Sequence, residues 1–179
     1  GNMVIDIGGG TTDIAILSLG GIVNSSSIRI AGNAFDLDIV KYIKDKYKLL
    51  IGERTAEDIK KTIGTVFPGS RKEKMEVRGR DLVTGLPHTI TLNSDEVEEA
   101  LRESVYTIIH CAKGILEQTP PELSADIIDK GIVLTGGGAM VDGFSNLLSQ
   151  ELKVPVFIAE SPLTCVAEGT GILLDNLYL

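Results

Sequence analysis

Residues 6–16 read DIGGGTTDIAI, and this stretch decides how the N-terminal part of the chain folds. Its three glycines separate two apolar, β-branched runs, 2–7 and 11–19, and a second glycine pair separates these from a third run, 22–30. Strand-like runs joined by tight glycine turns are typical of antiparallel hairpins. We therefore predict a meander of three antiparallel strands over these ranges.

The first glycine turn has the chemistry of a phosphate-binding loop. A turn without Cβ atoms brings its N–H groups close to a bound phosphate, and Thr11 and Thr12 add hydroxyl donors. Asp6, at the carboxyl end of the first predicted strand, suits a hydrated Mg²⁺, which keeps its waters and needs few carboxylates. The stretch is not a P-loop, because it lacks GK[ST] and precedes a strand. A glycine-rich hairpin without a ligand is the alternative.

A second glycine turn occurs in residues 134–139, which read LTGGGA. It links a predicted buried strand, 131–135, to a predicted helix, 143–152. Ligands of open α/β folds bind at the carboxyl ends of such strands. A plain strand–helix turn explains this motif when it is taken alone, but two glycine turns in one small domain favour a shared site. We predict that both turns lie on the same edge of one sheet.

The rest of the chain alternates helical and strand-like patterns. The predicted helices are 31–50 with Asn33 as its N-cap, 55–63 with Thr55 as its N-cap, 94–117 with Ser94 as its N-cap, 122–129, 143–152 and 162–177. Residues 65–93 contain two strand-like runs of a small sheet, and 154–158 forms a last strand. The pattern predicts an α/β core of a mixed five-stranded sheet with helices, made of 1–51 and 94–179, and a small α+β insertion over 52–93.

Composition limits the classes of function. The chain has 179 residues, of which 43% are hydrophobic and 23% charged, as is ordinary for a globular protein. Its net charge of −8 argues against binding to nucleic acid or to an acidic membrane surface. A nucleotide is still possible, because backbone N–H groups and a metal ion can hold phosphate. Cys111 and Cys165 form no CxxC motif, which fits a reducing cytoplasm, and each is predicted to be a small buried apolar residue.

Both glycine motifs resemble those of a known superfamily. DIGGGTTDIAI resembles the second phosphate motif of the actin, sugar-kinase and chaperone ATPases, and IVLTGGGAMVDGF (132–144) resembles their adenosine motif. ESPLTCVAEGTG (160–171) is similar to the closing segment of that fold. Within the superfamily the match to the bacterial actin-like MreB family is close, through SLGGIV (18–23), IGERTAEDIK (51–60), VRGRDL (77–82), TLNSDEV (91–97) and PPELSADI (120–127).

The resemblance implies an actin-like, ribonuclease H-like half-domain that corresponds to the C-terminal half of the family. It implies these roles: Mg²⁺ held through water by Asp6; phosphates bound by Gly8, Gly9, Gly10 and Thr11; ribose and adenine lined by Ala56, Glu57, Ile59 and Lys60; and the nucleoside enclosed by Gly136, Gly137, Gly138 and Ala139. For Glu57 and Lys60 the alternative is a solvated charge pair on one helix. Asp13 is left outside the site, as a carboxylate that caps the turn.

The implied function is that of an ATP-binding filament subunit that organises cell-wall synthesis and rod shape, with slow hydrolysis timing the state of the polymer. Its partners would be other copies of itself and the membrane proteins of the rod complex, at the cytoplasmic face of the cell membrane. The first phosphate motif, the acidic residue that orders the attacking water and the membrane contact belong to the other half of the family. We therefore expect no membrane contact and no turnover from this chain alone.

Two enzyme or chaperone alternatives belong to the same superfamily. A sugar kinase needs a substrate-binding insertion, but 52–93 is small, charged and without an evident polyol-binding cluster. A chaperone ATPase needs a substrate domain after its last helix. Both alternatives are weaker than the filament subunit.

Overall fold

The computed structural model describes residues 1–159 of the chain. The predicted helix 162–177, the segment 160–171 and Cys165 lie outside the described residues. In chain order the elements are β1 (Asn2–Ile7), β2 (Thr12–Ser18), β3 (Gly21–Ile28), α1 (Gly32–Tyr47), β4 (Leu49–Leu50), α2 (Glu53–Ile63), β5 (Lys74–Asp81), β6 (Pro87–Asn93), α3 (Ser94–Glu117), α4 (Pro121–Lys130), β7 (Ile132–Thr135), the 3₁₀ turn η1 (Gly137–Met140), α5 (Phe144–Leu152) and β8 (Val156–Ile158).

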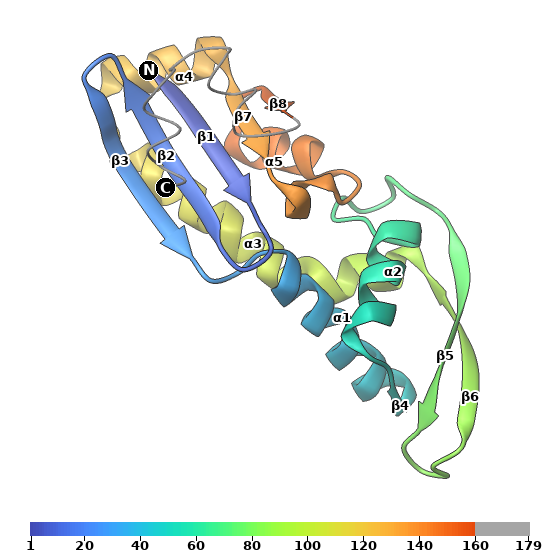
Figure 1. Ribbon diagram of the computed structural model, residues 1–179. Coiled ribbons are helices and arrows are strands. Elements are labelled where there is room, and N and C mark those ends of the chain that lie inside the picture. Colours follow the sequence, from blue (N-terminus) through green and yellow to red (C-terminus); the bar gives the residue numbers. More distant parts are fainter. Residues whose placement is uncertain (160–179) are drawn as a thin grey trace. The chain divides into compact units, whose positions relative to one another are not determined.

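The main sheet is mixed and has the strand order β3-β2-β1-β7-β8 (Figure 1). β1 and β2 are antiparallel, and so are β2 and β3, which confirms the predicted meander. β7 pairs in parallel with β1 on one side and with β8 on the other. The prediction of a mixed five-stranded sheet is therefore confirmed. β1, the central strand, carries one glycine turn, and its parallel neighbour β7 carries the other.

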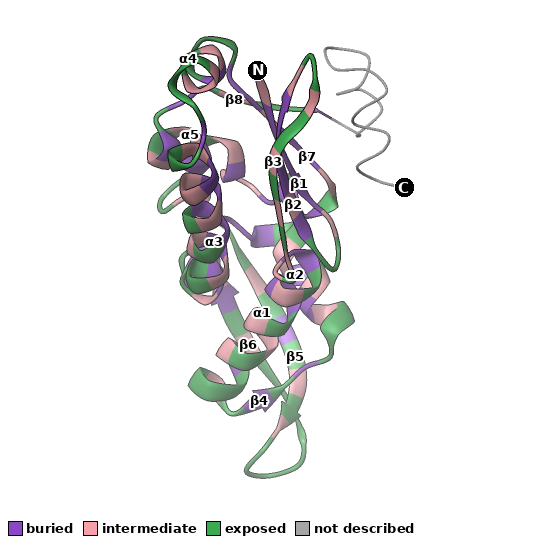
Figure 2. Ribbon diagram, turned by 90° about the vertical axis from the view of Figure 1, so that its left-hand side faces the viewer, coloured by how far each residue is buried: buried purple, intermediate pink, exposed green. Residues whose placement is uncertain are grey.

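The central strand is buried along almost its whole length. Every residue of β1 from Met3 to Ile7 is buried, as expected of a strand that is covered on both faces. On one face, Val4 packs in a cluster with Ala15, Leu17 and Ala159. Figure 2 shows α4 and α5 on the same side of this sheet. The apolar packing fixes the strand ends from which the glycine turns project.

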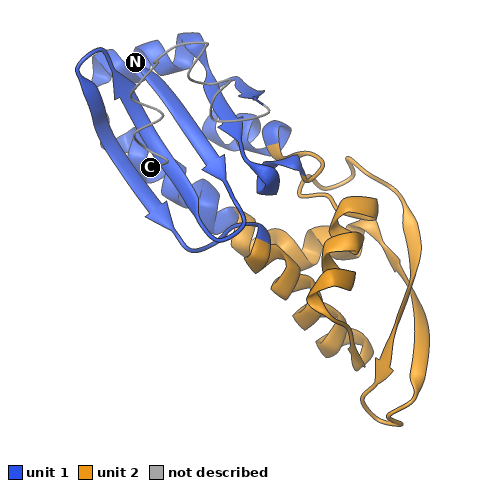
Figure 3. Ribbon diagram, viewed as in Figure 1, with its two compact units in different colours: residues 1–32, 106–140, 145–179 blue, residues 33–105, 141–144 orange. Residues whose placement is uncertain are grey.

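The chain divides into two compact units, which Figure 3 shows in blue and orange. Within the described residues, the first unit comprises 1–32, 106–140 and 145–159, and the second comprises 33–105 and 141–144. The first unit contains the five-stranded sheet and both glycine turns. The predicted insertion, 52–93, lies inside the second unit, which also takes in the flanking segments of α1 and α3.

The second unit has its own sheet, with strand order β4-β5-β6. β5 pairs antiparallel with β6, as predicted for the two runs within 65–93, and β4 adds a short third strand. Apolar side chains of three helices form its core: Phe35, Ile39 and Ile43 of α1, Ile59 and Ile63 of α2, and Val97, Leu101 and Val105 of α3. These spacings give each helix one apolar face.

The first long helix is shorter than predicted. It ends at Tyr47, and Lys48 adopts a left-handed backbone conformation with φ of 51°. Leu49 and Leu50, which the sequence placed in the helix, form β4 and pair with Asp81 and Arg80. No glycine marks this helix end, so the local sequence gives little warning of it.

The three predicted helix caps are all wrong. Asn33 lies inside α1, and α2 begins at Glu53 after Gly52, with no side-chain cap from Thr55. At α3 the capping residue is Asn93, whose Oδ1 accepts a 2.9 Å hydrogen bond from the Glu96 N–H. In return, Glu96 Oε1 accepts a 3.2 Å bond from the Asn93 N–H, which completes a capping box. The Ser94 hydroxyl is occupied elsewhere, by the backbone of Glu73.

Two smaller points complete the fold. Cys111 is only half-buried, and its thiol lies 3.5 Å from the Ser26 hydroxyl, so the prediction of a buried apolar residue is wrong at this position. Among residues 1–159, no helix combines the length and the apolar character that crossing a membrane requires.

Candidate functional site

Hydrogen bonds hold the first glycine turn where it joins its flanking segments, and the tip of the turn is exposed. The Gly8 N–H donates a 3.0 Å hydrogen bond to the Thr11 carbonyl, and the Gly8 carbonyl accepts one of 3.0 Å from the Gly32 N–H. The buried Thr12 hydroxyl donates a 2.6 Å bond to the Ile30 carbonyl. Gly9, Gly10 and Thr11 are exposed. The sequence therefore folds into a hairpin whose glycine tip faces solvent.

The second glycine turn begins directly after β7. Gly136 has φ of 95°, a backbone conformation that side chains with a Cβ rarely adopt. The Ala139 N–H donates a 3.1 Å hydrogen bond to the Gly136 carbonyl, which closes the turn as η1 begins. Gly137 is exposed, whereas Gly138 and Ala139 are buried.

The two turns touch each other. Asp6 of β1 is in register with Thr135 of β7, so the strands end side by side. A Cβ at Gly136 would collide with the Ile7 carbonyl oxygen and with Asp6 Oδ1. A Cβ at Gly138 would lie 2.5 Å from Ile7 Cγ2 and 3.0 Å from the Gly8 carbonyl oxygen. The prediction that both turns lie on one edge of the sheet is confirmed, and the glycines are what allows the close approach.

The glycines of this site fall into two kinds. Gly136 and Gly138 pack against the first turn and leave no room for a side chain. Within residues 1–159, nothing lies within 4 Å of a Cβ added at Gly10 or Gly137, so the described neighbours do not explain why these positions lack side chains. A bound nucleotide that needs close access to the backbone would explain it.

Two side-chain oxygens that could serve as metal ligands lie beside the two turns. Asp6 is buried at the end of β1. The Thr135 hydroxyl beside it in register is also buried and has no hydrogen-bond partner among the described residues. Mg²⁺ prefers oxygen ligands and keeps several waters, so one carboxylate beside a hydroxyl suits it. Residues 1–159 hold no group of three metal-ligating side chains. Sequence reasoning missed Thr135, because a threonine that ends a strand carries no motif.

Asp13 makes a hydrogen bond within the first glycine turn, as expected of a carboxylate that caps the turn. Its Oδ2 accepts a 3.1 Å hydrogen bond from the Thr11 hydroxyl, across the start of β2. Asp13 also faces Asp6 in the antiparallel register. The contact with Thr11 supports the description of Asp13 as a carboxylate that caps the turn.

The predicted ribose and adenine residues lie on α2, in the second unit. Ala56 and Ile59 are fully buried in the core of that unit. The Glu57 side chain is 45% exposed and forms an ion pair of 2.8 Å with Lys61, one turn further along the helix. The hydrogen bond from Lys61 lowers the pKa of Glu57 below its usual value. Lys60 instead contacts Asp36 of α1, at 2.8 Å. A solvated pair is thus present on α2, but its cation is Lys61.

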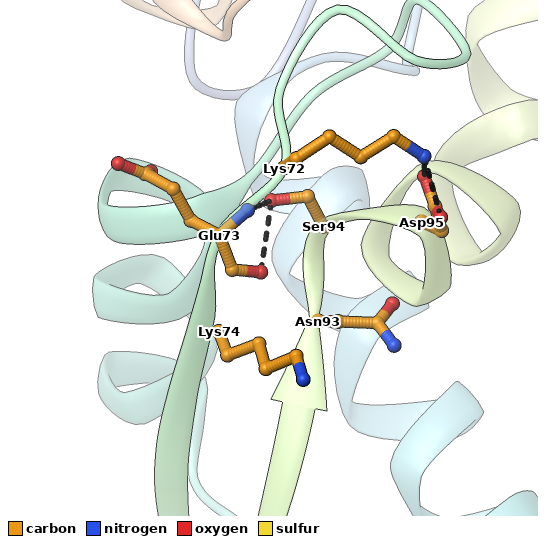
Figure 4. A pocket seen from close by; sticks show the side chains of 6 residues that line it. All are labelled: Lys72, Glu73, Lys74, Asn93, Ser94 and Asp95. Atoms are coloured by element: carbon orange, nitrogen blue, oxygen red, sulfur yellow. Dashed lines mark hydrogen bonds and ion pairs between the residues drawn. The ribbon is translucent and has the colours of Figure 1, made fainter.

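A separate hollow in the second unit takes in none of the predicted residues. It has a volume of about 150 Å³ and is lined by Lys72, Glu73, Lys74, Asn93, Ser94 and Asp95 (Figure 4). Lys72 Nζ lies 2.9 Å from both Asp95 carboxylate oxygens, and the Ser94 hydroxyl bonds the Glu73 backbone. Because Lys72 pairs with Asp95 and Ser94 bonds the Glu73 backbone across the hollow, we describe it as a structural junction.

Comparison with known proteins agrees with this geometry. The family model described as MreB/Mbl protein matches residues 1–179. The chain is 67% identical to the cell shape-determining protein Mbl of Bacillus cereus over 99% of its length, covering 53% of that protein. It is 51% identical to MreB of Escherichia coli, again over 99% of its length and 51% of the relative. The chain thus spans about half the length of these relatives.

Solved structures agree on the fold. The crystal structure of MreB5 of Spiroplasma citri bound to ADP is 44% identical and has a TM-score of 0.88, over 99% of this chain and 54% of that one; MreB5 is also known bound to AMPPNP. A double helical filament of MamK, 24% identical with a TM-score of 0.71 over 99% of this chain and 55% of that one, resembles it in fold alone. The fold is actin-like, and the chain belongs to the MreB/Mbl family of cell shape-determining proteins.

Proposed function

We propose that the first glycine turn binds the phosphates of ATP, that the second glycine turn closes around its nucleoside, and that Asp6 holds the accompanying Mg²⁺ through water. The observation that carries this proposal is the contact between the turns at the ends of β1 and β7, with Gly10 and Gly137 bordered by open space. Backbone N–H groups of the first turn can hold phosphate, while the adjoining second turn can contact the nucleoside of the same nucleotide. The nucleotides in the related MreB5 structures support the same ligand.

Each residue of the turns has a part in this proposal. Gly8, Gly9, Gly10 and Thr11 offer backbone and hydroxyl donors to the phosphates. Asp6 and the Thr135 hydroxyl supply oxygens toward the hydrated metal, which when bound would neutralise phosphate charge. For the ribose and adenine, the family resemblance supports Ala56, Glu57, Ile59, Lys60, Gly136, Gly137, Gly138 and Ala139. Ala56 and Ile59 would act as buried supports for their polar neighbours.

We propose further that the protein acts as a subunit of an ATP-regulated filament that organises cell-wall synthesis and rod shape. The names of its relatives as cell shape-determining proteins support this role, and the MamK filament shows that the fold is compatible with polymers. Its partners would be further copies of itself and the membrane proteins of the rod complex, at the inner face of the cell membrane.

The chain alone should bind ATP weakly and hydrolyse it undetectably. One pair of turns leaves the phosphates partly in water, where each hydrogen bond contributes only about 0.5–1.5 kcal/mol. Hydrolysis needs a positioned water and charge stabilisation from all sides. The experiments below therefore use the completed protein, which we define as this chain joined to the part of the Bacillus cereus relative that it does not cover.

The test of nucleotide binding replaces the two glycines that have open space around them. In the completed protein, Gly10→Ala and Gly137→Ala should each raise the Kd for ATP about tenfold or more, because a methyl group blocks close approach of the nucleotide to the backbone. Their thermal stability should stay unchanged. Gly114→Ala is the matched control, since Gly114 of α3 also has nothing within 4 Å of an added Cβ. Unchanged ATP affinity in both turn variants would refute the proposal.

The metal role is tested by turnover. In the completed protein, Asp6→Ala should largely abolish phosphate release, and Asp6→Asn should do the same while keeping the shape of the side chain. Steady release that survives both changes would show that the chemistry lies elsewhere.

A further inference from the structure

One row of side chains crosses three strands of the main sheet where the two glycine turns begin. Thr135 of β7 is in register with Asp6 of β1, and Asp6 is in register with Asp13 of β2. Residues in register on neighbouring strands point to the same side of a sheet, and the strands are about 4.8 Å apart. Asp6 therefore lies between a hydroxyl group on one side and a second carboxylate on the other.

The hydroxyl of this row is buried in an unfavourable way. Thr135 is 0% exposed, and its Oγ1 has no hydrogen-bond partner within residues 1–159. A buried hydroxyl without a partner destabilises a fold, and most buried polar groups have one. By contrast, the buried Thr119 hydroxyl donates a 2.7 Å bond to the Ile115 carbonyl. Valine has almost the shape of threonine and would avoid this cost, so the Thr135 hydroxyl calls for a role that valine could not fill.

We propose that Thr135 positions Asp6 for the metal: its hydroxyl donates a hydrogen bond to one carboxylate oxygen of Asp6, which leaves the other oxygen to hold the hydrated Mg²⁺. A hydroxyl has one proton to donate, and carboxylates that serve a metal are held in place by such donors. Asp13 is unsuited to this part, because a carboxylate has no proton to donate and its Oδ2 accepts a bond from the Thr11 hydroxyl. Since Thr135 is fully buried, it acts on the hydrated metal through Asp6.

Metal binding and the stability of the junction between β1 and β7 are then linked. Without metal, the Thr135 hydroxyl lowers stability, and with metal bound it gains Asp6 as its partner. A valine at position 135 is therefore favourable before loading and unfavourable after it, whereas a residue that only packs acts in the same direction in both states. Thr135 and Asp6 both belong to the first unit. This inference rests on the proposed nucleotide site and names a positioning residue within it.

The test measures metal-free stability and metal affinity on the same variants of the completed protein. Thr135→Val should raise the melting temperature in EDTA by about 2 °C, because it removes a buried hydroxyl that has no partner there. It should also raise the Kd for Mg²⁺, measured at saturating ADP, about tenfold, because Asp6 loses the donor that orients it. Thr135→Ser keeps the hydroxyl and should keep the Kd for Mg²⁺ of the unmutated protein.

Thr119→Val is the matched control, because it removes a buried hydroxyl of the first unit that already has a partner. It should lower the melting temperature in EDTA and leave the Kd for Mg²⁺ unchanged. The inference is overturned if Thr135→Val melts lower in EDTA or binds Mg²⁺ as tightly as the unmutated protein, or if Thr135→Ser loses as much affinity as Thr135→Val. If the unmutated completed protein binds no ADP, or if Asp6→Asn leaves its Kd for Mg²⁺ unchanged, the proposed function itself fails. If Asp6→Asn weakens Mg²⁺ binding and Thr135→Val does not, only this inference fails.

Discussion

The first and second units both have apolar cores, but they differ in the other features that these cores accompany. In the first unit the central strand is apolar from Met3 to Ile5, and glycines let the two turns come into contact. In the second unit the carboxylates of Asp36, Glu96 and Glu98 are buried, each beside a cationic partner. The first unit therefore depends on close backbone approach, whereas the second depends on charge pairing.

The largest expected effect tests the close approach in the first unit. Gly136→Ala should lower the free energy of unfolding by roughly 3 kcal/mol or more, because it adds backbone strain at φ of 95° to a collision with Ile7 and Asp6. Denaturant unfolding of the completed protein measures the loss, and hydrogen exchange of the β1 and β7 amides locates it.

Gly137→Ala is the control for that comparison. It lies next in the chain, but nothing stands within 4 Å of an added Cβ. Its free energy of unfolding should stay within about 0.5 kcal/mol of the unmutated protein. Equal losses for the two variants would show that the turns do not depend on their contact.

An intermediate effect tests charge pairing in the second unit. Glu96 accepts hydrogen bonds from Lys46 at 2.7 Å, from the Tyr47 hydroxyl and from the Asn93 N–H. Glu96→Gln removes the charge and should cost about 2 kcal/mol of unfolding free energy, a value already reduced because Lys46 is half-exposed and screened by solvent.

This loss should depend on pH. Burial alone would raise the pKa of Glu96, but the hydrogen bonds from Lys46, Tyr47 and Asn93 bring it below its ordinary value of 4.5. The charged carboxylate thus stabilises the folded state above pH 4.5, and this contribution is lost as the pH falls through the lowered pKa. Burial raises the pKa of Asp38, which acts in the opposite direction but equally in both proteins.

The difference in unfolding free energy between the unmutated protein and Glu96→Gln should therefore shrink as the pH is lowered. Unfolding of both proteins at pH 7 and at steps below pH 4.5 measures it. A difference that stays constant across that range would mean that the charge of Glu96 contributes nothing.

The smallest effect concerns the helix starts of the second unit. Asn93→Ala should cost about 1 kcal/mol, because it removes the hydrogen bond to the Glu96 N–H. Thr55→Ala should change stability by no more than a few tenths of a kcal/mol, since Thr55 lies inside α2 and caps nothing. Equal costs would show that the observed caps do not govern stability here.

Local patterns explain why the first unit could be predicted. The two strands that flank Gly8–Gly10 are apolar runs, and the glycines between them mark a turn. In the same way, the glycines that follow the apolar run 131–135 mark a turn at the end of that strand. Parallel pairing of β1 with β7 brings the turns together. What the sequence could not show is which glycines are packed and which are open, because this depends on atoms of the other turn.

The second unit was harder to predict because its contacts join distant segments. Leu49 and Leu50 continue the apolar pattern of a helix, but they form a strand because they pair with the edge of β5. Asp36 and Lys60 lie on different helices, so no spacing rule links them. The sequence also predicted Ser94 as a capping residue. Its hydroxyl instead bonds the backbone of Glu73, and Asn93 caps α3.

The parallel ladder between β1 and β7 has a consequence for the order of folding. β1, β2 and β3 are neighbours in the chain, and hairpins of this kind form in about 1–10 μs. Asp6 can pair with Thr135 only after α1, α2 and α3 have been synthesised and the chain has folded back on itself. This step carries the entropy cost of closing a long loop. On the ribosome, the first glycine turn would be formed well before its partner is synthesised. We expect the two glycine turns of the proposed nucleotide site to come together as one of the last events of folding.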